Sequence, residues 1–327
     1  MISLGLVGAG EFGHFASSVL DRLAGVKLVA ICDQNERAAR AIATRYKVPT
    51  YRSYHDFLGQ PLDMVAIFTP NDLHEPMVLQ ALQAGKHVFC EKPLALSERS
   101  VKLILKQAKQ AKRLVAVDFV LRHNQFYQKI HQKISQFGPL RSMLVSNLAS
   151  EATIKTPWYW DRQRSGGWFF TADIHFYDLF CWLSKAANPK QISATEYLSK
   201  HTGRTQAIAT LVSASAGAQL AVYHRFNAKG KAIGATVLLD FEQAQIELQG
   251  WVPRAMAIAT DGKIQRYRLD RDRETVYHAM VCRGLGQLSR AVKQGLPQQA
   301  VAEPEQLLIS HRIAELATRQ AVSVKLA

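Results

Sequence analysis

Residues 2–13, Ile-Ser-Leu-Gly-Leu-Val-Gly-Ala-Gly-Glu-Phe-Gly, decide the fold. The apolar start reads as a short buried strand, and the glycine pattern G-x-G-x-x-G follows it directly. Gly8 permits a tight turn, Gly10 lets the backbone approach a pyrophosphate, and Gly13 lets a helix pack closely on the strand. A helix that begins at Glu11 directs its free N–H groups toward the phosphates. The stretch therefore predicts a strand, a phosphate-binding turn and a helix.

Asp33 ends the next expected strand, twenty residues after Gly13. A carboxylate at this position accepts hydrogen bonds from ribose hydroxyls and repels a 2′-phosphate. Gln34 and Asn35 supply no cation, so the sequence favours NAD over NADP, although Arg37 lies one turn further and weakens the preference. In the alternative interpretation, the glycines only form a tight turn and Asp33 only caps the next helix. The common register of strand, glycines, helix and acid favours the dinucleotide.

Residues 2–118 alternate short apolar runs with helical patterns, which is typical of a parallel sheet built from βαβ crossovers. The expected strands carry little charge and many branched apolar residues, and they are Ile2–Val7, Lys27–Cys32, Met64–Phe68, His87–Cys90 and Leu114–Val117. The first helix is expected to place Val19, Leu20 and Leu23 on its apolar side.

A later helix is expected to begin near Asp72, with Glu75 as its capping partner, and to stop at Gly85. Farther along, the alternation around Leu220 and Val222 predicts antiparallel strands. A hairpin and two further helices are expected in the ranges 236–249, 275–293 and 303–320.

We therefore expect an α/β protein with two domains. Residues 1–120 form an NAD-binding Rossmann domain with a doubly wound parallel sheet. Residues 121–327 form a second α/β domain with a mainly antiparallel sheet, one face of which is solvated or forms an interface, and the last helix packs back on the first domain.

Composition excludes several classes of protein. The 327 residues are 48% hydrophobic and 20% charged, with four scattered cysteines and a net charge of +15. These values argue against disorder, a disulfide framework and a zinc knuckle, and no apolar run is long enough to cross a bilayer. We expect a cytoplasmic protein with reduced thiols, no metal site and no membrane partner. The basic stretch from Lys102 to Arg113 is interpreted as a solvated helix face, because nothing resembles a nucleic-acid-binding motif.

Polar residues follow two neighbouring strands of the expected parallel sheet. Thr69, Pro70 and Asn71 come after one strand, and Glu91 and Lys92 come after the next. Ligands of open parallel sheets bind beyond the carboxyl ends of the strands. The sequence therefore predicts that Lys92 lies in the cofactor crevice, where burial lowers the pKa of its ammonium group. A surface lysine paired with Glu91 is the alternative.

These segments carry a family resemblance. The runs Thr69-Pro70-Asn71-Asp72-Leu73-His74, Ala84-Gly85-Lys86-His87-Val88, Glu91-Lys92-Pro93-Leu94-Ala95, Ser165-Gly166-Gly167 and His175-Phe176-Tyr177-Asp178 strongly resemble the Gfo/Idh/MocA family of oxidoreductases. The resemblance implies a Rossmann domain followed by a domain with an open sheet that forms a homodimer or homotetramer. It also implies that Lys92 and His175 are the catalytic residues and meet at the nicotinamide. The predicted cofactor-binding residues are Gly8, Gly10, Glu11, Phe12, Gly13, Asp33, Arg37, Thr69, Pro70, Asn71, His74, Glu91 and Lys92.

One position departs from the family pattern. Members of the family commonly have an aspartate four residues before the histidine, whereas this chain has Thr171 there and Asp173 two residues later. The resemblance therefore leaves room for an altered proton relay. The predicted substrate-binding residues are Arg122, Trp160, Arg162, Thr171 and Asp173. A purely structural role for the tryptophans is equally compatible with the sequence.

The sequence thus predicts an NAD(P)-dependent dehydrogenase or reductase that acts on a hydroxyl or carbonyl carbon of a sugar, a cyclitol or a derivative. Two alternatives share the fold: a glycosidase that uses bound NAD for transient oxidation, and a dinucleotide-sensing regulator without enzymatic activity. A nucleic-acid-associated protein is a third alternative, suggested by the charge alone.

Overall fold

The computed structural model describes residues 1–149, 156–185, 188–215, 217–228 and 234–326. The chain forms two compact units. The first combines Met1–His123 with Tyr277–Leu307, and the second combines Asn124–Val276 with Leu308–Ala327. The segment Tyr277–Leu307 thus returns to the first unit and includes the start of the last helix, which begins at Pro304.

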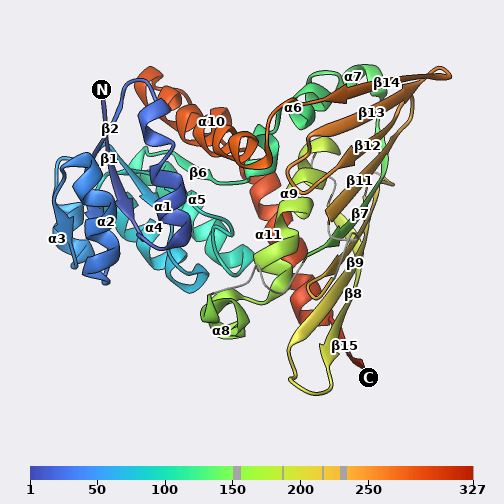
Figure 1. The fold of residues 1–327 in the computed structure, drawn as a ribbon, viewed down its shortest axis with the longest axis horizontal. Helices are drawn as coiled ribbons and strands as arrows, with labels where there is room; N and C mark the ends of the chain where they lie inside the picture. The colour runs from blue at the N-terminus through green and yellow to red at the C-terminus, as the bar shows by residue number, and fades with distance from the viewer. Residues whose placement is uncertain (150–155, 186–187, 216, 229–233, 327) are drawn as a thin grey trace. The chain divides into compact units, whose positions relative to one another are not determined.

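The first unit contains a six-stranded parallel sheet in the order β3-β2-β1-β4-β5-β6 (Figure 1). Its strands are β1 (Ile2–Val7), β2 (Val26–Cys32), β3 (Thr50–Tyr51), β4 (Met64–Ile67), β5 (His87–Cys90) and β6 (Val115–Val117). The five strands expected from the sequence are confirmed with ends within one residue, and β3 is the addition. The strand order reverses between β1 and β4, which is where open parallel sheets bind ligands.

The helices of the first unit are α1 (Glu11–Ser17), α2 (Glu36–Tyr46), α3 (Tyr54–Leu58), α4 (His74–Gln83), α5 (Glu98–Ala111) and, from Tyr277 onward, α10 (Arg273–Gln294). Short turns of tighter helix are η1 (Leu20–Arg22), η2 (Asn71–Leu73), η3 (Val120–His123) and η8 (Gln298–Ala300). The Gln298 side chain accepts from the Val115 N–H at 2.9 Å and donates to its carbonyl at 2.7 Å, and so satisfies backbone groups of the edge strand β6.

Two details of the helix predictions are wrong. The first helix ends at Ser17, because the hydroxyls of Ser17 and Ser18 donate to backbone carbonyls of the preceding turn, each at 2.7 Å, and the chain tightens into η1. Asp72 does not cap the helix that follows it. The turn η2 leads directly into α4, so the position before that helix is Leu73 in helical conformation and has no side-chain cap.

The second unit contains a mixed sheet of nine strands among the described residues, in the order β14-β13-β12-β11-β7-β10-β9-β8-β15. The strands are β7 (Leu140–Leu148), β8 (Pro189–Ser199), β9 (Thr205–Ala214), β10 (Gln219–Arg225), β11 (Gly234–Phe241), β12 (Gln245–Gln249), β13 (Ala255–Thr260), β14 (Lys263–Arg268) and β15 (Val322–Leu326). Only the pairs β7 with β10 and β8 with β15 are parallel, so the expected mainly antiparallel sheet and the β11–β12 hairpin are confirmed.

The helices of the second unit lie on one face of this sheet in Figure 1, and they include α9 and α11. They are α6 (Gln125–Gln132), α7 (Ile134–Phe137), α8 (Arg162–Ser165), α9 (Ile174–Leu183) and most of α11 (Pro304–Gln320), with the turns η5 (Pro157–Trp160) and η6 (Phe169–Asp173). Every residue of α9 is buried. Leu144, Leu211, Tyr223 and Leu238 are exposed hydrophobic side chains on strands of the sheet.

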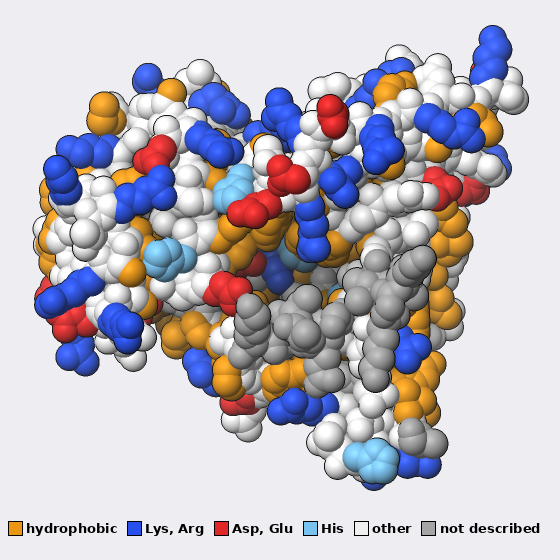
Figure 2. Space-filling model, viewed as in Figure 1, with side chains coloured by type: hydrophobic (Ala, Val, Ile, Leu, Met, Phe, Trp, Pro, Cys, Tyr) orange, Lys and Arg blue, Asp and Glu red, His pale blue; other side chains and the backbone are white. Residues whose placement is uncertain are grey.

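Positive charge is dispersed over the face of the molecule shown in Figure 2. On this face, Lys and Arg side chains lie among other residues rather than gathered in one stripe. Lys102, Lys106 and Lys109 are exposed on α5, whereas Ile104 and Ala108 are buried, as expected for a solvated helix face. Among the residues that the structure describes, no helix combines the length and the apolarity that a bilayer span requires.

Candidate functional site

The glycine turn between β1 and α1 is tightly built at two of its three glycines. Gly8 has a φ of 88°, and a Cβ there would lie 2.4 Å from the Phe68 carbonyl oxygen. A Cβ on Gly13 would lie 1.9 Å from the Gly8 carbonyl oxygen, whereas a Cβ on Gly10 would meet no atom within 4 Å. Gly10 precedes α1 and has no side chain to cap its N–H groups. The turn therefore offers open space and unsatisfied donors, which fit a phosphate group.

Asp33, directly after β2, is placed as the sequence predicts. Its Oδ2 accepts from the Ala9 N–H at 2.6 Å and its Oδ1 accepts from the Asn35 N–H at 2.7 Å. The cap of α2 is Asn35, whose side chain accepts from the Ala38 N–H. Asp33 is thus held beside the glycine turn and does not cap the helix, which fits a carboxylate that retains lone pairs for ribose hydroxyls.

The other predicted residues around the turn differ in their accessibility. Glu11 and Arg37 are exposed at the starts of α1 and α2. Phe12 is half-buried and packs against Phe68 and Tyr277, with ring centroids 5.5 Å and 6.5 Å away. Arg37 is therefore accessible to a ligand, whereas Phe12 contributes mainly packing.

His74 joins the segments that follow β4 and β5. The side chain is fully buried, with Nε2 2.8 Å from the Thr69 carbonyl oxygen and Nδ1 2.6 Å from the Pro93 carbonyl oxygen. Burial lowers the pKa of His74, and the two carbonyl oxygens oppose this shift. Thr69 and Pro70 are half-buried and Asn71 is buried. His74 therefore fixes both segments from within rather than facing a ligand itself.

Lys92 lies at the carboxyl edge of the sheet, after β5 and before the cis bond to Pro93. Its side chain is 12% exposed and that of Glu91 is 18% exposed, and Nζ lies 4.0 Å from the Glu91 Oε1. Asp118 follows β6 and is 1% exposed. These three ionisable groups form one cluster at the ends of neighbouring strands.

Burial dominates the ionisation of this cluster. It lowers the pKa of Lys92, while the carboxyl groups of Glu91 and Asp118 oppose the shift. Burial raises the pKa of Glu91 to about 7 and raises the pKa of Asp118 well above its usual range. A lysine whose pKa is lowered in this way can stabilise charge on a substrate oxygen and gives up its proton more readily than an exposed lysine.

His175 belongs to the second unit, in the first turn of α9, and is buried. Its ring centroid lies 5.4 Å from that of Trp251 in an edge-on contact. Thr171 and Asp173 precede it in the π-helical turn η6. The Thr171 hydroxyl donates to the Ser165 carbonyl at 3.3 Å. The π-helical geometry changes the four-residue spacing that would put Thr171 and His175 on one face of a regular helix.

Asp173 makes a polar contact with the sheet of the second unit. Its Oδ1 lies 3.1 Å from the Nδ1 of His224 on β10, and the Nε2 of His224 lies 3.1 Å from the Nδ2 of Asn147 on β7. Burial raises the pKa of Asp173, and the His224 contact opposes this shift. Asp173 is fully buried and contacts His224, and its predicted role in substrate binding stays a prediction.

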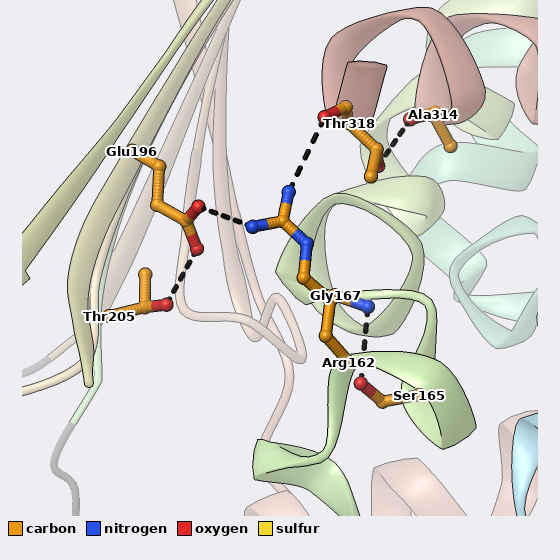
Figure 3. A network of polar contacts seen from close by, with 7 residues as sticks. All are labelled: Arg162, Ser165, Gly167, Glu196, Thr205, Ala314 and Thr318. Carbon is orange, nitrogen blue, oxygen red and sulfur yellow. Dashed lines mark hydrogen bonds and ion pairs between the residues drawn. The ribbon is translucent and has the colours of Figure 1, made fainter. Parts of the chain in front are cut away.

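Arg162 forms hydrogen bonds with Glu196 and Thr318 within the second unit (Figure 3). Its guanidinium donates to the Glu196 Oε2 at 3.0 Å and to the Thr318 carbonyl at 3.3 Å. Glu196 is 5% exposed, and its Oε1 accepts from the Thr205 hydroxyl at 2.7 Å. Glu196 therefore balances the charge of Arg162 within the second unit, and the predicted role of Arg162 in substrate binding stays a prediction.

Trp160 is half-buried in an aromatic cluster of the second unit. Its ring lies 5.0 Å from that of Trp168, and the Arg204 guanidinium lies 4.9 Å above it. Trp168 packs in turn on Phe226, with centroids 4.2 Å apart. Arg122 is half-buried in η3 of the first unit. The aromatic cluster supports the structural interpretation of the tryptophans.

Sequence reasoning missed three residues that the structure makes prominent. Asp118 follows an expected strand just as Lys92 does, so the same rule could have found it. His224 lies on the buried, apolar face of its strand, which is a signal for a polar partner. Glu196 gives no comparable signal, because its partner Arg162 is distant in the sequence.

Comparison with known proteins identifies similar chains. Residues 2–119 match the GFO_IDH_MocA family model, described as "Oxidoreductase family, NAD-binding Rossmann fold". An inositol 2-dehydrogenase of Salmonella typhimurium is 27% identical over 187 residues, which are 56% of this chain and 53% of that one. An inositol 2-dehydrogenase/D-chiro-inositol 3-dehydrogenase of Halalkalibacterium halodurans is 34% identical over 140 residues, 41% of this chain and 40% of that one.

The matched region spans about half the length of these curated relatives, which sets the extent of the sequence likeness. The likeness in three dimensions is wider. The structure of GenD2 from gentamicin A biosynthesis, in complex with NAD, has a TM-score of 0.84 at 20% identity and covers 98% of this chain and 93% of that one. This likeness confirms the fold over both units.

Proposed function

We propose that the protein, whose residues 2–119 match the family model of Gfo/Idh/MocA oxidoreductases, is an NAD-dependent dehydrogenase or reductase. Its substrate is a small polar molecule with a hydroxyl or carbonyl group, of the sugar or cyclitol class. One observation carries the proposal: in the first unit, the open glycine turn follows one strand, and Lys92, whose side chain is only 12% exposed, follows another strand at the same edge of the sheet. The identities of the relatives support the substrate class.

The residues of the chain have distinct tasks in this proposal. Bound NAD supplies the position that accepts the hydride. The N–H groups at the start of α1 hold the pyrophosphate, and Asp33 accepts from the ribose hydroxyls. Lys92 donates a hydrogen bond to the substrate oxygen and stabilises the charge that develops on it, because its site is largely withdrawn from water. We assign His175 as the base that takes the hydroxyl proton, since an imidazole titrates near neutral pH.

The preference for NAD rests on the charge at the end of β2. The Asp33 carboxylate is fixed by two backbone N–H groups and cannot swing away from a 2′-phosphate without losing them. Arg37 is exposed one turn into α2 and is free to approach such a phosphate. We therefore propose that NADP also binds, with lower affinity.

An assay with purified protein tests the proposal. A panel of sugars and polyols that includes myo-inositol is incubated with NAD, and the absorbance of the reduced nicotinamide is followed. Lys92→Ala is expected to lower kcat at least about 100-fold. Lys106→Ala, which removes an exposed lysine of α5, is expected to keep the full rate. Full activity of Lys92→Ala would refute the assignment, and cleavage of a chromogenic glycoside without net reduction of NAD would favour the glycosidase.

We also propose that the open face of the second sheet joins copies of the chain. Leu211, Leu144, Leu238 and Tyr223 are 59%, 47%, 42% and 39% exposed, which is unusual for large apolar side chains on neighbouring strands. Leu211→Glu is expected to lower the mass measured by light scattering to that of a monomer. A monomeric mass for the unmodified chain would contradict this proposal.

A further inference from the structure

The backbone places Asp118 beside Glu91 and Lys92, which follow β5 in the first unit. Asp118 directly follows β6, and its N–H donates to the Cys90 carbonyl at 2.8 Å. This bond continues the parallel pairing of β5 with β6 one step beyond the pair Cys90 and Val117. The side chain of Asp118 is therefore held at the strand ends that also carry Glu91 and Lys92.

The Asp118 carboxyl group has no evident structural task. It is buried, and its oxygens receive no hydrogen bond from an N–H or hydroxyl donor of a described residue; its hydrogen-bond partner is the Glu91 carboxyl group, once one of the two acids is protonated. Buried carboxyl groups usually have partners, because an unsatisfied polar group costs free energy. Stability of the fold therefore does not explain an aspartate at this position.

The ionisable groups around Asp118 give a reason for an aspartate at this position. Glu91 and Lys92, from the segment after β5, interact with it electrostatically, and so does the Cys90 thiol of β5. His74 of α4 faces Lys92 as well. Lys92 is the cation that both acids share.

The balance of charge in the cluster links Asp118 to Lys92. Two buried carboxylates beside one ammonium cannot both be ionised without a large desolvation cost. Burial lowers the pKa of Lys92, and the Asp118 charge raises it again. An ionised Asp118 therefore favours the charged, hydrogen-bonding form of Lys92.

Resting on the proposed function, we propose that Asp118 is a positioning residue whose carboxylate keeps the Lys92 ammonium group charged and in place for the substrate oxygen. Asp118 acts through Lys92 and does not itself touch the substrate. Glu91 is the second acid of the pair, and the two carboxyl groups share one proton, so the pair carries one negative charge that balances the Lys92 ammonium group.

The test measures the ionisation of Lys92 directly. The protein is labelled competitively with acetic anhydride over a series of pH values, and the peptide that contains Lys92 is quantified by mass spectrometry. Asp118→Asn keeps the size of the side chain and removes its charge, and it is expected to lower the labelling midpoint of Lys92 by about one pH unit. Asp56→Asn removes an equal charge from an exposed position on α3 and is expected to leave the midpoint unchanged.

An unchanged midpoint in Asp118→Asn, or an equal decrease in both variants, overturns the proposal. Labelling requires neither NAD nor substrate, so this result is separate from a failure of the proposed function. Once a substrate is in hand, Asp118→Asn is expected to lower kcat about tenfold at nearly constant KM and to move the pH profile in the same direction as the midpoint. Asp118→Glu is expected to restore part of the rate. A lower kcat with an unmoved pH profile would show a merely structural role.

A reciprocal measurement covers the case in which Asp118→Asn does not fold. Lys92→Met removes the ammonium group and leaves the Asp118 side chain in place. The pKa of Asp118, followed by carbon-13 NMR of the carboxyl group, is expected to rise by about one unit relative to the unmodified protein. An Asp118 titration that is identical in the two proteins overturns the proposal.

Discussion

Replacing two glycines of the same turn separates phosphate binding from packing. An added Cβ at Gly10 meets no atom within 4 Å, and the φ of −68° and ψ of −167° suit alanine. An added Cβ at Gly13 lies 1.9 Å from the Gly8 carbonyl oxygen, which is a backbone atom. Gly10→Ala should therefore fold normally and lose ligand affinity, whereas Gly13→Ala should lose stability.

The structure sets the size of both effects. A Cβ on Gly13 lies 1.9 Å from the Gly8 carbonyl oxygen, and Cβ atoms essentially never approach another heavy atom within 3.0 Å. The turn and α1 must therefore separate by more than 1 Å to accommodate alanine. Overpacking of this kind costs about 3 kcal/mol, and the better helix propensity of alanine returns about 1 kcal/mol. A net loss of about 2 kcal/mol lowers the melting temperature of a unit of this size by roughly 4–8 °C. Gly10→Ala should change the unfolding free energy by less than about 0.5 kcal/mol.

Two measurements distinguish the loss of stability from the loss of NAD affinity. Thermal melts report stability, and calorimetric titration with NAD reports affinity, for which we expect at least a tenfold higher Kd, or about 1.4 kcal/mol, in Gly10→Ala. Equal melting temperatures for the two variants would refute the packing argument. Undiminished NAD affinity in Gly10→Ala would show that the pyrophosphate does not lie over Gly10, and the assignment of the turn would then be wrong.

Three further predictions follow from single side chains. Asp33→Asn should lower the ratio of the NADPH Kd to the NADH Kd about tenfold in fluorescence titrations, because the charge that repels a 2′-phosphate is removed. An unchanged ratio of the two Kd values would contradict the role of Asp33. Burial raises the pKa of Glu91 from 4.5 to about 7, so the folded protein binds the proton more tightly and its unfolding free energy falls as pH rises between these values. In urea unfolding, Glu91→Gln should show a smaller decrease of the unfolding free energy over this pH range. An equal decrease in both proteins would contradict the pKa shift of Glu91. Arg162 is half-exposed, so a double-mutant cycle of Arg162→Met and Glu196→Gln should give a coupling of only about 1 kcal/mol, and a value near zero would show that the pair contributes nothing.

Local sequence patterns predicted the parallel sheet because its strands are short, apolar and buried on both faces. Every residue of β4 is buried, so the strand stands out without any alternation. The strand Thr50–Tyr51 is too short to leave a pattern. The end of the first helix was not predicted, because its apolar spacing continues past Ser17 while serine hydroxyls compete for the carbonyls of the preceding turn.

Residues at strand ends were predictable for a reason of topology. Parallel strands present their carboxyl ends at one edge of the sheet, so the sequence alone predicts that Asp33 and Lys92 lie at that edge. The ion pair of Arg162 with Glu196 was not predicted, because Glu196 comes from a strand whose register the sequence does not determine. Long-range ion pairs of this kind depend on which strands become neighbours, and that information is not local.

The π-helical turn before α9 links the unusual sequence to the chemistry of the second unit. A regular helix would set Thr171 over His175, but the wider turn Phe169–Asp173 changes that relation. The Thr171 hydroxyl is committed to the Ser165 carbonyl, and the Asp173 carboxylate to His224. Because the turn differs from a regular helix, the four-residue spacing alone does not transfer the role of the family's aspartate to Thr171. In the proposed reaction, we therefore expect His175 itself to accept the hydroxyl proton.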